Sequence, residues 1–300
     1  MSNLSFAPLN NRGIIKISGP DAREFLQGLV SGDVQAVTAE NAIWSAFLSP
    51  QGKYLYDFFI CEADDALILD CERERLSEFL KKLVMFKLKA QVKISDETNN
   101  LSVFVVLGDG FENAIGMTPS PGSTVQFAGG VAFIDPRTEK IGARVIAPEQ
   151  IAVDALLGAG FQSATDIGPY NYLRIKLGLP DGSRDLTIDR ALLLENGFEE
   201  LGGVSFEKGC YIGQEVTART RYRGLVKKRL VPVSIDGPTP EAGTPIMCDE
   251  REVGEMKSSE ADVGLALIRV ENLNDESPLI AGTAHLKPAI PEWMVIRKPE

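Results

Sequence analysis

The sequence predicts an α+β fold that ends in a small β-barrel. In the first 150 residues, short apolar segments with a strand-like pattern alternate with helix-like segments, and none of these helices is long. This alternation is typical of α+β packing. From Leu225 onward the chain changes to short apolar segments separated by glycine, proline and aspartate, which is typical of a small barrel. Two domains are therefore predicted, residues 1–224 and residues 225–300.

The first predicted elements are a strand and a helix. Residues 14–17 form an apolar strand that ends at a Gly-Pro pair, and Asp21 then begins a helix that extends to about Leu29. Two further strands, 43–48 and 54–60, flank a Ser-Pro-Gln-Gly turn signal.

The longest predicted helix covers residues 72–89, where apolar side chains recur every three or four positions. A second helix is predicted at 168–179, followed by a long loop with one short helical piece at 180–205. The other strands of the first domain are expected at 66–71, 91–95, 101–107, 131–134 and 143–146. The barrel strands are expected at 225–235, 244–248, 252–257, 262–270 and 281–287.

Composition limits the classes of function. The 300 residues carry a net charge of −11, which opposes general binding to nucleic acid. No apolar run reaches the roughly 18 residues of a membrane span, and the N-terminus lacks the pattern of a signal peptide. Four cysteines without a closely spaced pair, and a single histidine, predict neither a disulfide scaffold nor a metal site. We therefore expect a bacterial cytoplasmic protein with no membrane partner.

The most informative segment runs from Lys208 to Glu215 and reads KGCYIGQE. Its cysteine, Cys210, lies between glycines, which allow the backbone to turn sharply and expose a thiol. Neighbouring cations lower the pKa of a thiol and so favour a reactive site. The alternative is a buried cysteine that only fills a core.

A basic stretch follows this segment directly. The three arginines Arg219, Arg221 and Arg223 alternate with other residues, so on a strand they would share one face. Such a face is either a site for a small anion or a solvated edge strand protected by charge. The stretch places six cations in eleven residues of an acidic chain: Arg219, Arg221, Arg223, Lys227, Lys228 and Arg229.

KGCYIGQE followed by Arg219 resembles the signature of the YgfZ-type folate-binding proteins, which are related to the aminomethyltransferase (T-protein) of glycine cleavage. Residues 21–29, with Gly-Asp-Val at 32–34, resemble the N-terminal helix of that family. Residues 47–53 resemble its strand-turn-strand, and residues 173–180 resemble the helix and turn before its active region. The resemblance therefore covers nearly all of the chain.

This resemblance implies a T-protein-like folate-binding body of two α+β lobes plus a C-terminal β-barrel, arranged as a ring around a central hole. It implies tetrahydrofolate or a derivative as the ligand, with Glu195 hydrogen-bonded to the pterin ring. The residues expected to complete the folate site are Arg219, Arg221 and Arg223, near the glutamate tail, together with Tyr211 and Gln214. Cys210 would serve as a redox thiol or as a transient ligand of an iron–sulfur cluster. Lys208 would tune this thiol or orient its loop.

The chain also departs from T-proteins. The aspartate required for aminomethyl transfer is replaced by Leu55, and Tyr56 follows it. The tyrosine expected after residues 177–179 is replaced by Pro-Asp-Gly, and T-proteins lack the cysteine of the motif.

The resemblance and these departures together imply a folate-binding accessory protein in iron–sulfur cluster assembly or repair, without classical turnover. Its partners would be assembly proteins or client iron–sulfur enzymes, including enzymes that modify tRNA, with no direct contact to nucleic acid. The alternatives are a folate-dependent aminomethyl or one-carbon transferase and a scaffold that has lost its ligand.

Overall fold

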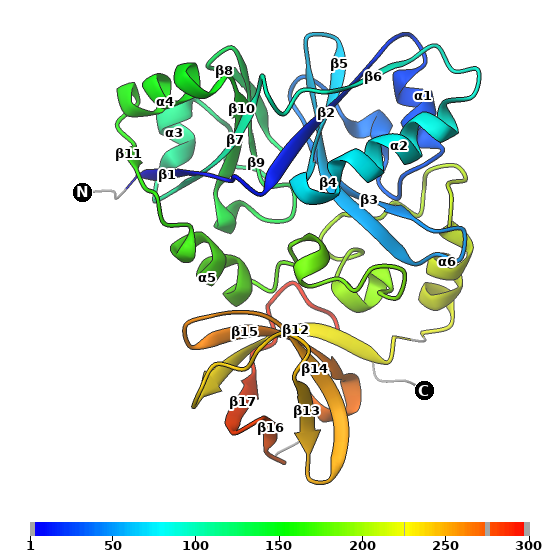
Figure 1. Ribbon diagram of the computed structural model, residues 1–300, viewed down its shortest axis with the longest axis vertical. Coiled ribbons are helices and arrows are strands. Elements are labelled where there is room, and N and C mark those ends of the chain that lie inside the picture. The colour runs from blue at the N-terminus through cyan, green and yellow to red at the C-terminus, as the bar shows by residue number, and fades with distance from the viewer. Residues whose placement is uncertain (1–3, 225, 274–276, 297–300) are drawn as a thin grey trace. The chain divides into compact units, whose positions relative to one another are not determined.

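The computed structural model describes residues 4–224, 226–273 and 277–296 (Figure 1). The chain folds into two compact units. Unit 1 comprises Met1–Leu48, Leu55–Ile167 and Gly202–Ile212, and unit 2 comprises Ser49–Tyr54, Gly168–Leu201 and Gly213–Glu300. The predicted boundary at residue 224 divides the chain in another way and stays a prediction. Leu225, where the first barrel strand was expected to begin, lies outside the described residues.

The first lobe of unit 1 is a five-stranded sheet with the strand order β3-β4-β5-β2-β6. Strand β2 pairs in antiparallel fashion with β5 and β6. The strands are β2 (Arg12–Ser18), β3 (Ile43–Leu48), β4 (Tyr54–Ala63), β5 (Ala66–Glu72) and β6 (Lys93–Asp96). The helices of this lobe are α1 (Ala22–Gln27) and α2 (Leu76–Lys87).

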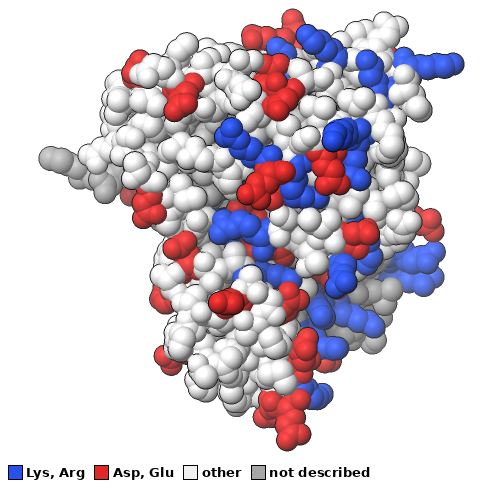
Figure 2. All heavy atoms as spheres, viewed as in Figure 1, with Lys and Arg blue, Asp and Glu red and all other residues white. Residues whose placement is uncertain are grey.

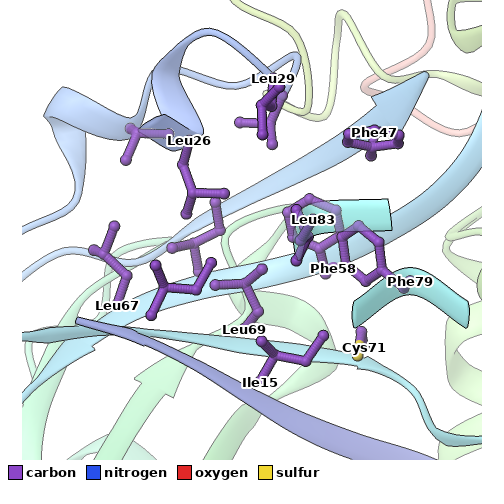
Figure 3. Packing of buried hydrophobic residues seen from close by; sticks show 14 of the residues in the cluster. Ile15, Leu26, Leu29, Phe47, Phe58, Leu67, Leu69, Cys71, Phe79 and Leu83 are labelled. Carbon is purple, nitrogen blue, oxygen red and sulfur yellow. The ribbon is translucent and has the colours of Figure 1, made fainter. Parts of the chain in front are cut away.

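Helix α2 packs on this sheet through aromatic and aliphatic side chains (Figure 3). Phe79 and Leu83 of α2 lie in one fully buried cluster with Phe58 of β4. The rings of Phe79 and Tyr56 are stacked, with their centroids 4.4 Å apart. Positions 76, 79 and 83 share a helix face because they are three and four residues apart, so the predicted helix is confirmed.

The second lobe is a six-stranded sheet with the order β11-β1-β7-β10-β9-β8. Its strands are β1 (Ser5–Pro8), β7 (Ser102–Leu107), β8 (Thr124–Phe127), β9 (Gly130–Ile134), β10 (Ala143–Ala147) and β11 (Gln162–Ser163). Its helices are α3 (Phe111–Ile115) and α4 (Glu149–Gly158). Leu156 of α4 packs with Val145 of β10 in the core of this lobe. The sequence predicted β7, β9 and β10 but missed both helices.

Buried charges connect the two sheets of unit 1. Arg12 of β2 donates to one carboxylate oxygen of Asp70 at 2.6 Å, and Arg144 of β10 donates to the other at 2.8 Å. Arg137 pairs with Asp135 at 2.7 Å. Burial alone would raise the pKa of Asp135, but the guanidiniums of Arg137 and Arg144 hold it below its usual value. Asp70 and its two arginines therefore join strands that are distant in the sequence, whereas Arg137 and Asp135 form a local pair.

Unit 2 contains a closed six-stranded barrel with the order β12-β15-β14-β13-β16-β17. Its strands are β12 (Lys228–Asp236), β13 (Pro245–Cys248), β14 (Arg251–Glu260), β15 (Val263–Arg269), β16 (Leu279–Ala281) and β17 (Ala284–Pro288). The sequence predicted five of these strands and missed the short β16. The predicted α+β lobes and C-terminal barrel are thus confirmed.

Helix α5 (Gly168–Lys176) lies against the barrel, where Ile175 packs with Leu230 and Leu265. Arg174 of α5 is fully buried and pairs with Asp185 at 2.8 Å. Unit 2 also holds helix α6 (Gln214–Tyr222). Short 3-10 helices complete the described chain: η1 (Val34–Ala36), η2 (Arg73–Arg75), η3 (Glu139–Ile141), η4 (Gly182–Arg184), η5 (Leu193–Asn196) and η6 (Val270–Asn272). Over the residues described, no helix has the length and apolarity needed to cross a membrane.

Candidate functional site

The loop that carries Cys210 is tied to the segment Val30–Gly32 of unit 1. The Ser205 amide donates to the Ser31 carbonyl at 2.9 Å, and the Ser31 hydroxyl donates to the Gly203 carbonyl at 2.6 Å. Two residues before Cys210, the Lys208 ammonium donates to the carbonyls of Val30 at 2.8 Å and Gly32 at 2.7 Å. Beyond Cys210, Ile212 packs against the core of the first lobe. Cys210 therefore lies between two fixed points of one lobe.

Cys210 is the exposed thiol of this protein. The chain has four cysteines, all within the described residues, and Cys61, Cys71 and Cys248 are buried. Burial raises the pKa of the Cys61 thiol strongly and that of Cys71 to about 12, so both are held as neutral thiols. The solvent exposure expected for Cys210 is confirmed, whereas its place at the rim of a cavity stays a prediction.

Lys208 acts on the backbone of the loop. Burial lowers the pKa of its amine to about 8, and Asp33 offsets part of that effect. The amine also lies 5.3 Å from the centre of the Tyr211 ring, which is buried beneath it. These contacts support the hypothesis that Lys208 orients the loop, and they give Tyr211 a supporting role in the same loop.

The arginine-rich segment is a helix, and the strand expected there is wrong. Helix α6 begins after Gly213, whose φ of +80° turns the chain. Arg219 lies one turn after Glu215 and pairs with it at 3.3 Å, while Thr217 and Thr220 form a buried side. Glutamine, glutamate, alanine and arginine, which are frequent in this segment, favour a helix. The spacing of its polar residues fits the helical period of 3.6 residues as well as the strand period of two.

The helix separates the three arginines. Arg219 and Arg223 lie one turn apart on the exposed surface, and Arg223 makes no ion pair with any described residue. Arg221 instead pairs with Glu199 at 2.6 Å. It lines a cavity of about 110 Å³ with Arg229 and Glu200, which also pair at 2.6 Å. Two carboxylates thus balance the two guanidiniums of this cavity. The candidates for an anion are therefore Arg223 and Arg219, whose own pair with Glu215 is exposed to solvent.

Glu195 lies half-buried in η5 of unit 2. Burial raises the pKa of its carboxyl group, and Lys228, Lys53 and Arg229 oppose that shift. Glu195 accepts no hydrogen bond from the described part of the chain, so its oxygens keep their capacity to accept hydrogen bonds. The sequence reading singled out Glu195 but missed Lys53 and Lys228 as its neighbours, although Lys53 ends a segment that resembles the family.

A glycine positions Lys53 near this carboxylate. Gly52 has a φ of +72°, and a Cβ there would lie 2.8 Å from the Gly213 carbonyl oxygen and 2.8 Å from the Cβ of Val216. The turn before Lys53 therefore lies against the beginning of α6, where Gln214 is the first, half-buried residue. This close approach requires glycine.

An apolar side chain, that of Leu55, occupies the position that corresponds to the aspartate required by the transferase. Leu55 packs against the core of the first lobe. The next acid, Asp57, is buried and accepts a hydrogen bond from the Trp44 indole at 3.1 Å. The described residues contain no group of three or more His, Cys, Asp or Glu side chains that could hold a metal ion.

The chain is similar to proteins of known name. Residues 227–296 match the family model "CAF17, C-terminal beta-barrel domain". Over 314 residues the chain is 31% identical to "Iron-sulfur cluster assembly factor IBA57, mitochondrial" of Mus musculus, and the alignment covers 95% of this chain and 84% of that protein. The protein of the same name in Homo sapiens is 31% identical over 308 residues, with the same coverage.

A solved structure shows the same fold. The glycine cleavage system aminomethyltransferase T of Bartonella henselae superposes with a TM-score of 0.79, at 13% sequence identity, over 100% of this chain and 88% of that one. The T-protein-like fold is thus shown. The cytoplasmic location expected from the sequence is contradicted, because the names of the relatives place them in the mitochondrion.

Proposed function

The chain belongs to the IBA57 family of iron–sulfur cluster assembly factors, and from this premise we propose that it supports cluster assembly through the thiol of Cys210. The observation that carries the proposal is the contrast among the four cysteines, of which Cys210 is exposed and three are buried. A thiolate is the soft ligand that iron–sulfur clusters prefer. The cluster is the cargo of this reaction.

This chain can offer a cluster one cysteine ligand at most, the thiolate of Cys210. Iron–sulfur clusters are usually held by four thiolates, and the remaining cysteines lie in cores. The other ligands would therefore come from a partner, either an assembly protein or a client enzyme. We further propose that the client enzymes include enzymes that modify tRNA. The resemblance to YgfZ-type proteins supports this part of the proposal.

Reduced folate is the second component of the proposal. The aminopyrimidinone edge of a pterin presents paired N–H donors, which suit a carboxylate such as Glu195. Lys53 and Lys228 beside Glu195, together with Arg219 on α6 and Arg223 just after it, suit the anionic glutamate tail. Bound folate would supply a one-carbon carrier. Aminomethyl transfer is not part of the proposal, because Leu55 takes the place of the aspartate that this reaction requires.

A deletion strain tests the proposal directly. Wild type should restore the activity of iron–sulfur enzymes, whereas Cys210→Ser should fail at equal levels of soluble protein. Serine is close in size to cysteine, but its hydroxyl is not ionised at neutral pH and binds iron poorly. Cys248→Ser, which removes a buried thiol of the barrel, is the matched control and should restore activity. Full complementation by Cys210→Ser would refute the role of the thiol.

A further inference from the structure

The outward side of helix α2 exposes three large apolar side chains. Val84 is 48% exposed, Met85 is 65% exposed and Leu88, just after the helix, is 89% exposed. Single exposed apolar residues are common on protein surfaces, but these three lie within five consecutive positions. We call them the α2 apolar face.

The α2 apolar face does not pack against the core of the first lobe. Phe79 and Leu83 point to the opposite side of α2 and are fully buried in the first lobe (Figure 3). Val84 and Met85 are one and two residues beyond Leu83, so the helical period carries them to the outer side, and the exposed Leu88 directly follows the last residue of the helix. Packing therefore explains the inner side of α2 and leaves the outer side unexplained.

The backbone of Leu88 adds a second observation. Leu88 has a φ of +45° and a ψ of −109°, outside the regions that a leucine favours. This ψ also lies outside the left-handed αL region in which helices commonly end, and glycine is the residue that adopts such a backbone conformation with least strain. Leucine at this position therefore costs stability through its backbone, and its exposed side chain recovers none of that cost by burial. Strain of this kind is concentrated at functional sites.

Positive charge surrounds the α2 apolar face. The segment 79–95 contains no aspartate or glutamate, although the whole chain has a net charge of −11. Lys82 pairs with Glu78 at 3.8 Å, whereas Lys81, Lys87 and Lys89 form no ion pair with any described residue. Figure 2, in the view of Figure 1, shows basic side chains over α2. The segment carries five lysines: Lys81, Lys82, Lys87, Lys89 and Lys93.

We propose that the α2 apolar face and its lysines dock on the surface of an anionic lipid bilayer. Lysine is depleted at protein–protein interfaces, whereas apolar side chains ringed by lysine are typical of helices that lie in the headgroup region. The lysines pair with anionic headgroups, and Met85 and Leu88 enter the region below them. This contact is peripheral. It is independent of the function proposed for Cys210, and it departs from our expectation from the sequence that the protein has no membrane partner.

Vesicle co-sedimentation tests the proposal with the full chain. The protein should bind vesicles of phosphatidylcholine mixed with phosphatidylglycerol and should not bind phosphatidylcholine alone. Binding should fall steeply as salt is added, because screening weakens exposed charges. Replacement of Lys81, Lys87 and Lys89 by glutamine should weaken binding about a hundredfold, at about fivefold per lysine. The double variant Met85→Ser, Leu88→Ser should also lose binding, with an unchanged melting temperature.

Matched variants elsewhere provide the controls. Ile151→Ser with Leu157→Ser removes two exposed apolar side chains from α4, and glutamine at Arg251, Arg269 and Lys287 removes three exposed charges from the barrel. Both controls should bind like wild type. The proposal is overturned if wild type does not bind the mixed vesicles, if it binds neutral vesicles equally, or if the controls lose as much binding as the α2 variants.

Discussion

Replacing Lys208 with methionine tests whether this lysine holds the cysteine loop in place. Methionine keeps most of the length and the apolar stem of the side chain but has no hydrogen-bond donor. In the wild type, the amine donates to the carbonyl oxygens of Val30 at 2.8 Å and Gly32 at 2.7 Å. The variant loses both bonds, while the hydrogen bonds between the loop and Ser31 remain.

The expected magnitude follows from these two bonds. A typical hydrogen bond contributes about 1 kcal/mol net, and about 1.5–3 kcal/mol when one partner is charged. We use the lower value because Lys208 is only half-buried and water can replace part of each bond. Loss of both bonds should therefore favour local opening of the loop by about 2 kcal/mol, which is roughly a 30-fold larger open population.

Hydrogen exchange measures this opening. The Ser205 amide, which donates to the Ser31 carbonyl at 2.9 Å, is the reporter within the loop and should exchange roughly 30-fold faster in Lys208→Met. The exposed Lys227 provides the control, since Lys227→Met removes an amine without touching the loop. Unchanged exchange of Ser205 in Lys208→Met would show that the lysine does not hold the loop.

The same variant should also change how the free energy of unfolding depends on pH. The pKa of Lys208 falls from 10.5 to about 8 because burial disfavours the charged amine. Between these two values the unfolded chain binds more protons than the folded protein, so the contribution of Lys208 to stability rises with pH from about 8 to about 10.5. Subtracting the variant's urea-unfolding free energies from those of the wild type should show this rise. A flat difference would contradict burial of the amine.

Further variants test the remaining features. A thiol reagent should modify one cysteine quickly in the native wild type and none in Cys210→Ser, because the other three are buried; rapid modification of a second thiol would contradict the packing. Glu195→Gln should weaken tetrahydrofolate binding about tenfold, measured by calorimetry, through loss of a charged hydrogen bond; equal affinity would exclude Glu195 from the site. Gly52→Ala should lower the free energy of unfolding by more than about 1–2 kcal/mol, given its φ of +72°; a variant as stable as wild type would mean that the turn does not need glycine. Asp70→Asn should cost about 3–5 kcal/mol, because the buried Arg12 and Arg144 would both lose the charged carboxylate that they share; a loss below about 1 kcal/mol would show that other partners compensate for it.

Local pattern was enough to predict the α+β class and the barrel, and the two lobes were implied by the family resemblance. The spacing of Leu76, Phe79 and Leu83 identifies α2 because a helix that lies on a sheet must repeat its apolar residues at this period. Glycine, proline and aspartate mark the turns of the barrel in the same way. The glycines around Cys210 indicated an exposed thiol, and the structure confirms that exposure.

Pairing across the chain could not be predicted. Asp70 lies 58 residues from Arg12 and 74 residues from Arg144, and no local pattern connects them. The same limit hid the Val30–Gly32 segment as the anchor of Lys208, since 178 residues separate Lys208 from Val30. At α6 the difficulty was one of period, because alternating arginines suit a strand until Glu215 is counted as a helical partner.

The α2 apolar face was overlooked for a different reason. The periodicity of residues 72–89 is strong enough to identify a helix even when additional apolar residues interrupt its polar side. From the sequence alone, the apolar residues Val84, Met85 and Leu88 cannot be distinguished from residues that pack in the core. Their exposure becomes informative only when the structure shows that other residues of α2 fill the core.

The cysteine loop reconciles two needs that usually conflict. A thiol that meets a partner must protrude, and a protruding loop is usually mobile, so binding would cost the free energy of ordering it. Here Gly209 allows protrusion, while the bonds from Lys208 and Ser205 and the packing of Ile212 hold the loop on both sides of the thiol. Ordering is thus largely complete before a partner arrives. For this reason Lys208→Met should weaken support of client enzymes even though Cys210 keeps its thiol.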